Sequence, residues 1–138
     1  MIRLLILTPK GVYLDKEVER FLVPSTKGPL EICGGYTPLI AGLKPAGVLK
    51  VTMGKAKFFA IFNGTLKVEK DRAYILCDDI EDGYAIDMAR AIASRDRALD
   101  RLDKHDPDID LKRAKASLAR ALARIDVKNL DEGKAIIY

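Results

Sequence analysis

The sequence predicts an α+β fold in which an N-terminal antiparallel β-sandwich precedes a C-terminal two-helix antiparallel hairpin. Up to about Asp79, short β-branched and aromatic runs alternate with Gly and Pro, which is typical of a sandwich or barrel. From about Asp82 onward Gly and Pro nearly disappear, and Ala and Leu recur at helical spacing among charged residues. Pro107 divides this second part into two segments of similar length. We therefore expect a β domain in residues 1–82 and a helical hairpin with an irregular C-terminal tail in residues 83–138.

Each expected strand is bounded by turn residues. The first run ends before Pro9-Lys10-Gly11, and the second ends at Pro24. Gly54-Lys55 and Asn63-Gly64 separate the later runs. Because no segment of helical length lies between these runs, a parallel sheet of β-α-β units is not expected. The expected strands are residues 2–8, 17–23, 29–33, 47–53, 57–62 and 66–77.

The first helix is expected to begin at Asp82 or Tyr84 and to end near Lys104. The second helix is expected from Ile109 to about Val127, and the sequence after it has no clear period. Alanine-rich faces let two helix axes approach closely but bury little apolar area, so the hairpin should open at modest cost. The expected contact stripes are Ala85, Met88, Ala91, Ile92, Leu99 and Leu102 on the first helix, and Leu111, Ala114, Leu118, Ala121, Leu122 and Ile125 on the second.

The composition argues against several classes of function. The net charge of +4, with both signs interleaved, is too weak to indicate nucleic-acid binding by itself. The only histidine, His105, has no cysteine near it in the sequence, so the residues needed for a zinc site or a histidine-based triad are largely missing. The acidic stretch at residues 77–83 lacks the spacing of a calcium loop, and we expect a solvated linker there. We therefore expect neither a metal site nor catalytic residues.

Cysteine usage and hydropathy bear on the compartment. Cys33 and Cys77 lie in apolar runs, which predicts buried free thiols and suits a reducing compartment. No apolar run approaches the roughly 20 residues of a membrane span, and the first run is expected to be a strand rather than a signal peptide. We therefore expect a soluble chain that reaches a membrane only through a partner.

Polar residues rich in arginine follow one face of each expected helix. If the helices pair through Ala and Leu, these two stripes flank one edge of the seam, and their guanidinium groups converge. Arginine forks match phosphate oxygens, so an anion would relieve their mutual repulsion, while Asp87 could accept from an amine or a ribose hydroxyl. The stripes are Asp87, Arg90, Ser94, Arg97 and Arg101 on the first helix, and Arg113, Ser117, Arg120 and Arg124 on the second.

The same pattern has a simpler interpretation. Arginines on an exposed helix face are usually solvated or paired with acidic residues one turn away, here Asp96, Asp100 and Asp103. Asp87, close to a helix start, would then complement the helix dipole or hold Arg90. The residue types alone leave both interpretations open.

Five sequence stretches, taken in order, help to decide between these two interpretations of the arginine stripes. They are LLILTPKGVYLDKEVERFLVPSTKGPLEI, YTPLIAGLKPAGVLKV, IFNGTLKVEKDRAYIL, AIDMARAIASRDRAL and LKRAKASLARALARI. In this order and at this spacing, the chain resembles the epsilon subunit of F-type ATP synthases, from the first strand to about Val127. The fold of that family is a ten-stranded β-sandwich followed by a two-helix hairpin, which is the same order of a β part and a helical part as expected above.

The resemblance implies a non-catalytic central-stalk subunit of a proton- or sodium-translocating complex. The β domain would bind the gamma subunit and the c-ring. The hairpin would either fold onto the sandwich or extend toward the alpha and beta subunits, where it would inhibit ATP hydrolysis. Such a subunit would lie at the cytoplasmic face of the bacterial plasma membrane, attached only through the complex.

The resemblance also implies a regulatory ATP site. In several bacterial members the folded hairpin binds one ATP without hydrolysing it, through a motif of Ile or Leu, Asp, two variable residues, Arg and Ala. Residues 86–91 of this chain match that motif, and the remaining family positions are a glutamate upstream and three further arginines. The implied site is Glu81, Ile86, Asp87, Arg90, Ala91, Arg97, Arg120 and Arg124.

Two alternatives remain open at this point. The chain could be a purely structural rotor subunit that binds no nucleotide, its arginines serving only subunit contacts. It could instead be a free-standing nucleic-acid-binding module that uses the basic hairpin, although few aromatic side chains are available to stack on bases and acidic residues interleave with the basic ones.

Overall fold

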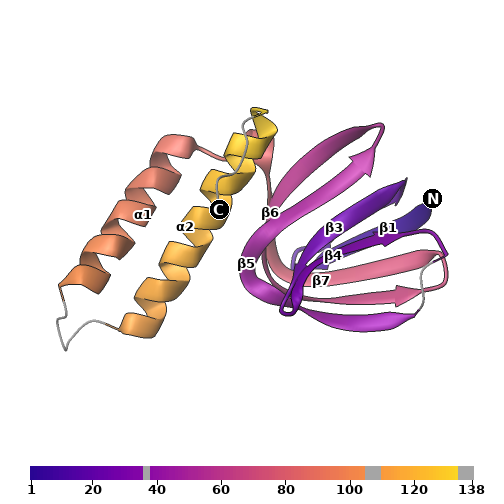
Figure 1. Cartoon of the computed structure of the whole chain (residues 1–138), viewed down its shortest axis with the longest axis horizontal. Helices are drawn as coiled ribbons and strands as arrows, with labels where there is room; N and C mark the ends of the chain where they lie inside the picture. The colour runs from indigo at the N-terminus through magenta and orange to yellow at the C-terminus, as the bar shows by residue number, and fades with distance from the viewer. Residues whose placement is uncertain (36–37, 105–109, 134–138) are drawn as a thin grey trace.

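The computed structural model describes residues 1–35, 38–104 and 110–133. A β part is followed by one 3₁₀ turn, η1, and by two helices (Figure 1). The elements are β1 (Ile2–Thr8), β2 (Gly11–Val18), β3 (Arg20–Ser25), β4 (Gly28–Cys33), β5 (Leu39–Met53), β6 (Lys55–Glu69), β7 (Arg72–Asp82), η1 (Gly83–Ala85), α1 (Met88–Asp103) and α2 (Leu111–Asp131).

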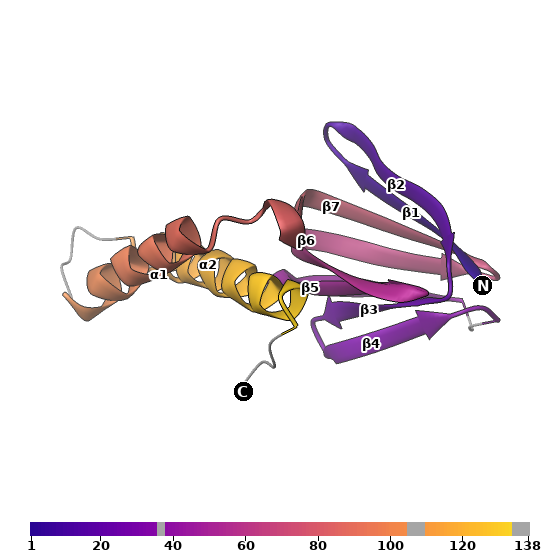
Figure 2. The same cartoon turned by 90° about the horizontal axis from the view of Figure 1, so that it is seen from above.

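The seven strands form one sheet in the order β2-β1-β7-β6-β5-β3-β4. The sheet curls so that β3 and β4 lie opposite β1, β2 and β7, and the two layers enclose the core (Figure 2). This arrangement confirms the predicted β-sandwich followed by two helices. One pair departs from antiparallel pairing, because β1 runs parallel to β7.

The longest strands, β5 and β6, each continue through a residue that disfavours a regular strand. Pro45 lies at a register shift in the ladder between Leu43 and Ala46, where its missing N–H removes no ladder bond. Asn63 adopts a left-handed φ of 47° but stays in β6: the register with β7 is unbroken from Phe62 to Gly64, and the Asn63 side-chain amide donates to Asp78 at 3.0 Å. A Cβ at Gly64 would lie 2.6 Å from the Leu76 carbonyl oxygen, so the close approach of β7 requires glycine. The expected strand break at Asn63-Gly64 was therefore wrong.

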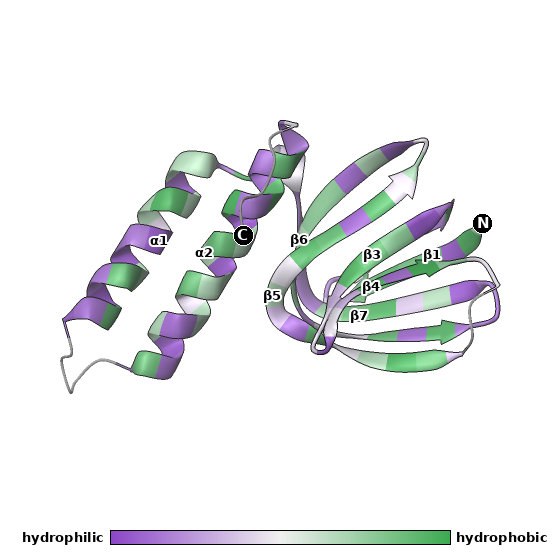
Figure 3. Cartoon of the chain, in the orientation of Figure 1, coloured by the Kyte–Doolittle hydropathy of each residue, from purple (hydrophilic) through white to green (hydrophobic). Residues whose placement is uncertain are grey.

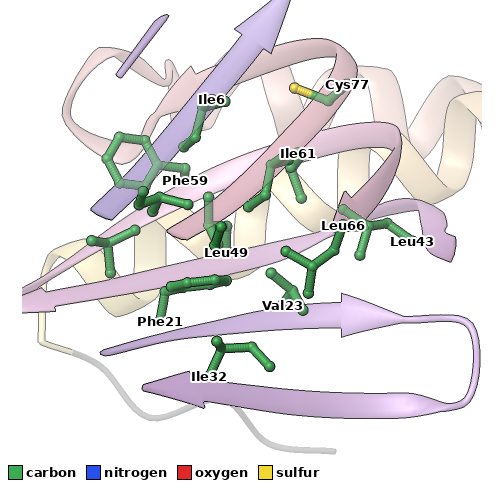
Figure 4. Packing of buried hydrophobic residues seen from close by; sticks show 14 of the residues in the cluster. Ile6, Phe21, Val23, Ile32, Leu43, Leu49, Phe59, Ile61, Leu66 and Cys77 are labelled. Atoms are coloured by element: carbon green, nitrogen blue, oxygen red, sulfur yellow. The ribbon is translucent and has the colours of Figure 1, made fainter. Parts of the chain in front are cut away.

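The core lies between the two layers and follows the alternation of each strand (Figures 3 and 4). On β6 both faces are covered, since Phe59 and Ile61 point into the sandwich while Ala60 and Phe62 point toward the hairpin. A strand buried on both faces needs a continuous apolar run, which the sequence supplies at residues 58–62. The largest fully buried side chains are Phe21, Ile2, Leu4, Ile6, Ile32, Leu49, Ile61, Leu66 and Ile75.

The junction between the two parts differs from the sequence prediction. The acidic stretch expected as a linker is the end of β7, where Ile80 is buried in the core. Asp82 caps η1 through its carboxylate, which accepts a hydrogen bond from the Tyr84 backbone N–H at 2.9 Å. The first helix begins only at Met88, because Asp87 is its N-cap and accepts from the Arg90 N–H at 3.2 Å.

The second helix is longer than predicted. Asp110 caps its start by accepting from the Arg113 N–H at 3.1 Å, and the helix continues to Asp131. Gly133, with a φ of 78°, follows its end and donates its N–H to the Leu130 carbonyl. His105, Pro107 and Ile109, on which the predicted helix break rested, lie outside the described residues.

The hairpin packs through small side chains. Figure 1 shows α2 between α1 and the sheet, and α2 contacts β5 and β6. Ala91, Ala114 and Ala121 are buried, as predicted for the helix seam, and Ala98, which the predicted stripe left out, is buried with them. Val127, buried on α2 and absent from the predicted stripe, packs in one cluster with Phe62 and Ala60, and Ala123 is buried as well. Ala85 and three predicted stripe leucines, Leu99, Leu111 and Leu122, are exposed instead.

A substitution at Gly83 should test how tightly α2 is seated. A Cβ there would lie 3.0 Å from both the Phe58 carbonyl oxygen and Val127 Cγ1, and 3.1 Å from Asp131 Cβ. We expect Gly83→Ala to push α2 outward and to destabilise its docking by about 1–3 kcal/mol. Hydrogen exchange of the α2 amides should accelerate. Gly42→Ala is the matched control, because its Cβ would meet only Thr26, at an ordinary distance of 3.8 Å. Unchanged hydrogen exchange of the α2 amides in Gly83→Ala would contradict the packing described.

The two cysteines occupy different environments. Cys33, predicted to be buried, is exposed at the end of edge strand β4, because Ile32 takes the inward position in the alternation. Cys77 is buried as predicted, and burial raises the pKa of its thiol from 9.0 to about 11. Both are free thiols.

This difference predicts selective alkylation. At mildly alkaline pH iodoacetamide should modify Cys33 first, because the raised pKa lowers the thiolate fraction of Cys77 about 100-fold and burial blocks access. Between pH 9.0 and about 11 the unfolded thiol loses its proton while the folded thiol keeps it, so Cys77 lowers folding stability as pH rises. Cys77→Ala should flatten that part of the stability profile. Equal alkylation rates of the two thiols in the folded chain, measured by mass spectrometry, would contradict this placement.

Candidate functional site

A cavity of about 310 Å³ opens where the end of β7, η1 and the two helices meet. It is therefore built by both parts of the chain, and it exists only while the hairpin lies on the sandwich. Its walls combine apolar side chains, hydroxyl and carboxylate oxygens, and two guanidinium groups. The lining residues are Glu81, Ala85, Ile86, Asp87, Arg90, Ala91, Ser94 and Arg124.

Most of the site implied by the sequence comes together at this cavity. Six of its residues line the walls: Glu81, Ile86, Asp87, Arg90, Ala91 and Arg124. Arg97 and Arg120 do not line it. Each donates to a serine one turn earlier on its own helix, Arg97 to Ser94 at 3.0 Å and Arg120 to Ser117 at 3.4 Å. Because Ser94 is itself a wall residue, Arg97 lies one hydrogen bond away from the cavity.

The local sequence explains how the first helix presents its wall. Ile86, in extended backbone before the helix, is buried and packs in the cluster with Phe62 and Val127, which anchors the start of α1. Asp87 then caps α1, so its carboxylate is held at the cavity rim. Ala91 lies one turn further on and is buried at the helix seam, where a larger side chain would fill the cavity.

Arg124 joins the hairpin to the sandwich. Its Nε and Nη2 donate to the two oxygens of Glu81 at 2.8 and 2.9 Å, a bidentate pair between α2 and β7. The guanidinium carbon lies 5.0 Å from the centroid of the Phe62 ring, so the same group also stacks on β6. The hydrogen bond with Glu81 raises the pKa of Arg124 further above its ordinary value. Both side chains are only about 30% exposed, which limits solvent screening of the pair.

Arg90 contrasts with Arg124. Within the described part of the chain, its side chain makes neither a hydrogen bond nor an ion pair, and the residue is exposed at the cavity wall. Its backbone N–H is bonded to Asp87, whose carboxylate therefore serves the helix cap rather than the Arg90 guanidinium. The cavity thus holds one uncommitted cation beside one satisfied ion pair, which suits a ligand that carries negative charge.

Some contributors were not predicted from the sequence. The sequence predicts Ser94 only as a polar member of the helix stripe, although its place one turn after Arg90 is a usable signal. It predicts Ala85 at the helix seam, whereas the structure places Ala85 on the cavity wall. Phe62 could not be found, because its contact with Arg124 depends on the sheet presenting its outer face to α2.

The described residues offer neither a metal site nor a membrane-spanning helix. Among residues 1–35, 38–104 and 110–133, no group of three or more His, Cys, Asp or Glu side chains is placed to hold a metal ion. Neither helix of the described chain is long and apolar enough to cross a membrane.

Comparison with known proteins defines the class. Residues 1–83 match the family model for the β-sandwich domain of the ATP synthase delta/epsilon chain. Residues 85–129 match the model for the long α-helix domain of the same chain. The sandwich and the hairpin are therefore the two parts of one established architecture.

Individual relatives agree with this class. The chain is 36% identical over 104 residues to the ATP synthase epsilon chain of Bacillus licheniformis, covering 75% of this chain and 79% of that one. It is 37% identical over 109 residues to that of Desulforamulus reducens, covering 78% and 81%. The chain belongs to the ATP synthase delta/epsilon family, as an epsilon subunit of the F type, and this confirms the resemblance found in the sequence. It is accordingly a non-catalytic subunit.

Solved structures share the fold. One similar chain occurs in the Euglena gracilis mitochondrial ATP synthase (OSCP/F1/c-ring, rotational state 1), with a TM-score of 0.69, 19% identity and coverage of 96% of this chain and 79% of that one. Another occurs in the central stalk/c-ring of the Tetrahymena thermophila mitochondrial enzyme, with a TM-score of 0.63, 16% identity and coverage of 92% and 96%.

The bidentate pair predicts a measurable coupling between the two parts. Glu81→Gln leaves the half-buried Arg124 guanidinium without its carboxylate and should destabilise hairpin docking by about 1–3 kcal/mol. Hydrogen exchange of α2 should therefore accelerate more than exchange in the sandwich core. Glu69→Gln, which removes a more exposed partner of Lys67, is the control and should change neither. Equal behaviour of the two variants would show that the pair does not hold the hairpin.

Proposed function

We propose that this chain is a regulatory central-stalk subunit whose hairpin binds ATP when folded and inhibits ATP hydrolysis when extended. The sandwich would bind the gamma subunit and the c-ring. The extended hairpin would reach the alpha and beta subunits with its arginine stripes facing an acidic surface. The complex would place the subunit at the cytoplasmic face of a bacterial plasma membrane. The observation that carries the proposal is the cavity shared by the sandwich and both helices.

The cavity offers complementary groups for each part of ATP. Arg90 is uncommitted and would bind phosphate oxygens, and Arg97 could turn toward them from Ser94. The Asp87 carboxylate at the rim would accept from a ribose hydroxyl or from the adenine amine. Ala85, Ile86 and Ala91 provide the apolar wall against which a base could lie.

The geometry also supports a switch. A ligand in this cavity would touch β7, α1 and α2 together, so it would bind the folded hairpin better than the extended one. That difference in affinity is the only way in which a ligand can shift the population of the two states. The contact that docks α2 onto the sheet is small. Val127 is the only large apolar side chain of α2 that is fully buried in the described structure, and its burial contributes about 1.5–3 kcal/mol. Because so little free energy holds the hairpin in place, a ligand of moderate affinity can change the populations of the folded and extended states substantially.

One observation favours the structural alternative without nucleotide. The fork of Arg124 is already satisfied by Glu81, so phosphate binding to Arg124 would have to displace a bidentate carboxylate. If that exchange is unfavourable, the pair is simply a structural clasp between the hairpin and the sandwich. Direct measurement of ATP binding distinguishes these functions.

Calorimetry of the isolated chain should detect ATP binding at one site. Arg90→Ala should weaken the affinity about 10-fold or more, and Arg120→Ala should weaken it less, because Arg120 does not line the cavity. Lys112→Ala, on the exposed start of α2, is the control and should bind like the unaltered chain. Full affinity in both arginine variants would remove the assigned site. The absence of binding at millimolar ATP, with gamma binding intact, would favour the structural alternative.

A further inference from the structure

A second cavity, of about 430 Å³, lies within the sandwich and shares no wall residue with the first. It opens between β2 and the β5–β6 hairpin. Its apolar floor is formed by Leu14, Tyr13 and Phe59, and the two rings meet edge to face with centroids 6.1 Å apart. Three lysines also line this cavity: Lys16, Lys55 and Lys57.

The cavity separates two strand edges that lack strand partners. β2 is the first strand in the sheet order and pairs only with β1. β6 pairs with β7 only from Phe59 onward, so residues 55–58 have β5 on one side and no strand on the other. No backbone–backbone hydrogen bond from elsewhere in the described chain reaches residues 55–58. An extended segment entering here would therefore find unused backbone donors and acceptors on both sides.

The charge in the cavity is unbalanced. The side-chain ammonium groups of Lys16 and Lys55 have neither a hydrogen-bond nor an ion-pair partner in the described part of the chain. Lys57 lies 3.6 Å from Asp82, but the other Asp82 oxygen already accepts the Tyr84 N–H, so this carboxylate serves the cap of η1 as well. Three ammonium groups thus surround one carboxylate, and the site suits a partner that brings additional negative charge.

The pleat predicts where that charge should lie in the partner. Lys57 is two residues from Phe59, and Lys16 is two residues from Leu14, so each lysine shares a strand face with an apolar floor residue. A strand paired beside them would meet the floor with one side chain and a lysine with the side chain two positions away. The partner strand that matches this arrangement therefore carries a large apolar residue, then any residue, then Asp or Glu.

We propose that this cavity is a docking site for an extended segment of a partner polypeptide with that spacing, bound as an added strand between β2 and β6. The proposal does not depend on ATP binding or on hairpin movement, because it uses the sandwich alone. The edge provides main-chain hydrogen bonds, the aromatic floor takes the apolar anchor, and the lysines select acidic partners over basic ones.

A competing explanation makes an opposite prediction. Lysines on edge strands often serve to prevent edge-to-edge pairing of identical chains. In that case their removal would cause self-association, and no acidic peptide would bind specifically. Both outcomes can be measured on the same variants.

The test uses the full chain and a capped synthetic peptide of sequence Phe-Thr-Glu-Thr-Glu. Backbone amide spectra should show shifts confined to β2 and residues 55–59. Two control peptides, one with Lys in place of Glu and one N-methylated on alternate amides, should bind at least about 10-fold more weakly. The Lys16→Gln/Lys55→Gln double variant should lose about 10-fold in affinity, whereas Lys67→Gln, on the distant half of β6, should not.

Three results would overturn the proposal. These are no shifts at millimolar peptide, equal binding of the acidic and basic peptides, and dimerisation of the double variant in sedimentation velocity with peptide affinity unchanged. Circular dichroism of the double variant establishes that the sandwich remains folded. These lysines do not line the first cavity, so we expect the substitutions to leave ATP calorimetry unchanged. Failure here is therefore distinguishable from failure of the proposed function.

Discussion

The contact between α2 and the outer face of β5 and β6 is the interaction on which the rest of the structure depends. It consists of a few apolar side chains, chiefly Val127 against Phe62, and of one guanidinium held between a carboxylate and an aromatic ring. Because α1 packs on α2, its position relative to the sandwich is set largely through this contact. The cavity between the two parts therefore exists only while α2 is seated.

The strength of this contact suits a reversible joint. A sandwich core with at least nine fully buried large side chains is a stable body, whereas the hairpin presents mostly alanine to its neighbours. Small apolar areas contribute little free energy, so specificity has to come from a polar contact with defined geometry. Arg124 supplies it, because its bidentate bonds to Glu81 fix the register of α2 against β7. A ligand that changes the partners of this cluster would act directly on the joint.

Much of the fold could be predicted because local rules and global structure agree. The alternation of apolar residues and the placement of turn residues predicted the sandwich, and helical spacing of Ala and Leu predicted the hairpin. The errors arose where tertiary contacts override local preference. β6 continues through Asn63 instead of ending there, the acidic end of β7 stays extended because Ile80 reaches the core, and Val127 faces the sheet rather than the partner helix. The site followed from a family motif, whereas the contact of Phe62 with Arg124 needs the three-dimensional packing of β6 against α2.

The central claim is that the hairpin is lightly held and that ATP favours its folded position. It is tested most directly by pulsed electron paramagnetic resonance between spin labels at the exposed Cys33 on β4 and at Leu99→Cys, an exposed position on α1. We expect a broad distance distribution for the free chain that narrows to a single folded population when ATP is added. A narrow distribution that is identical with and without ATP would show instead that the hairpin is rigid and that ATP does not change its position.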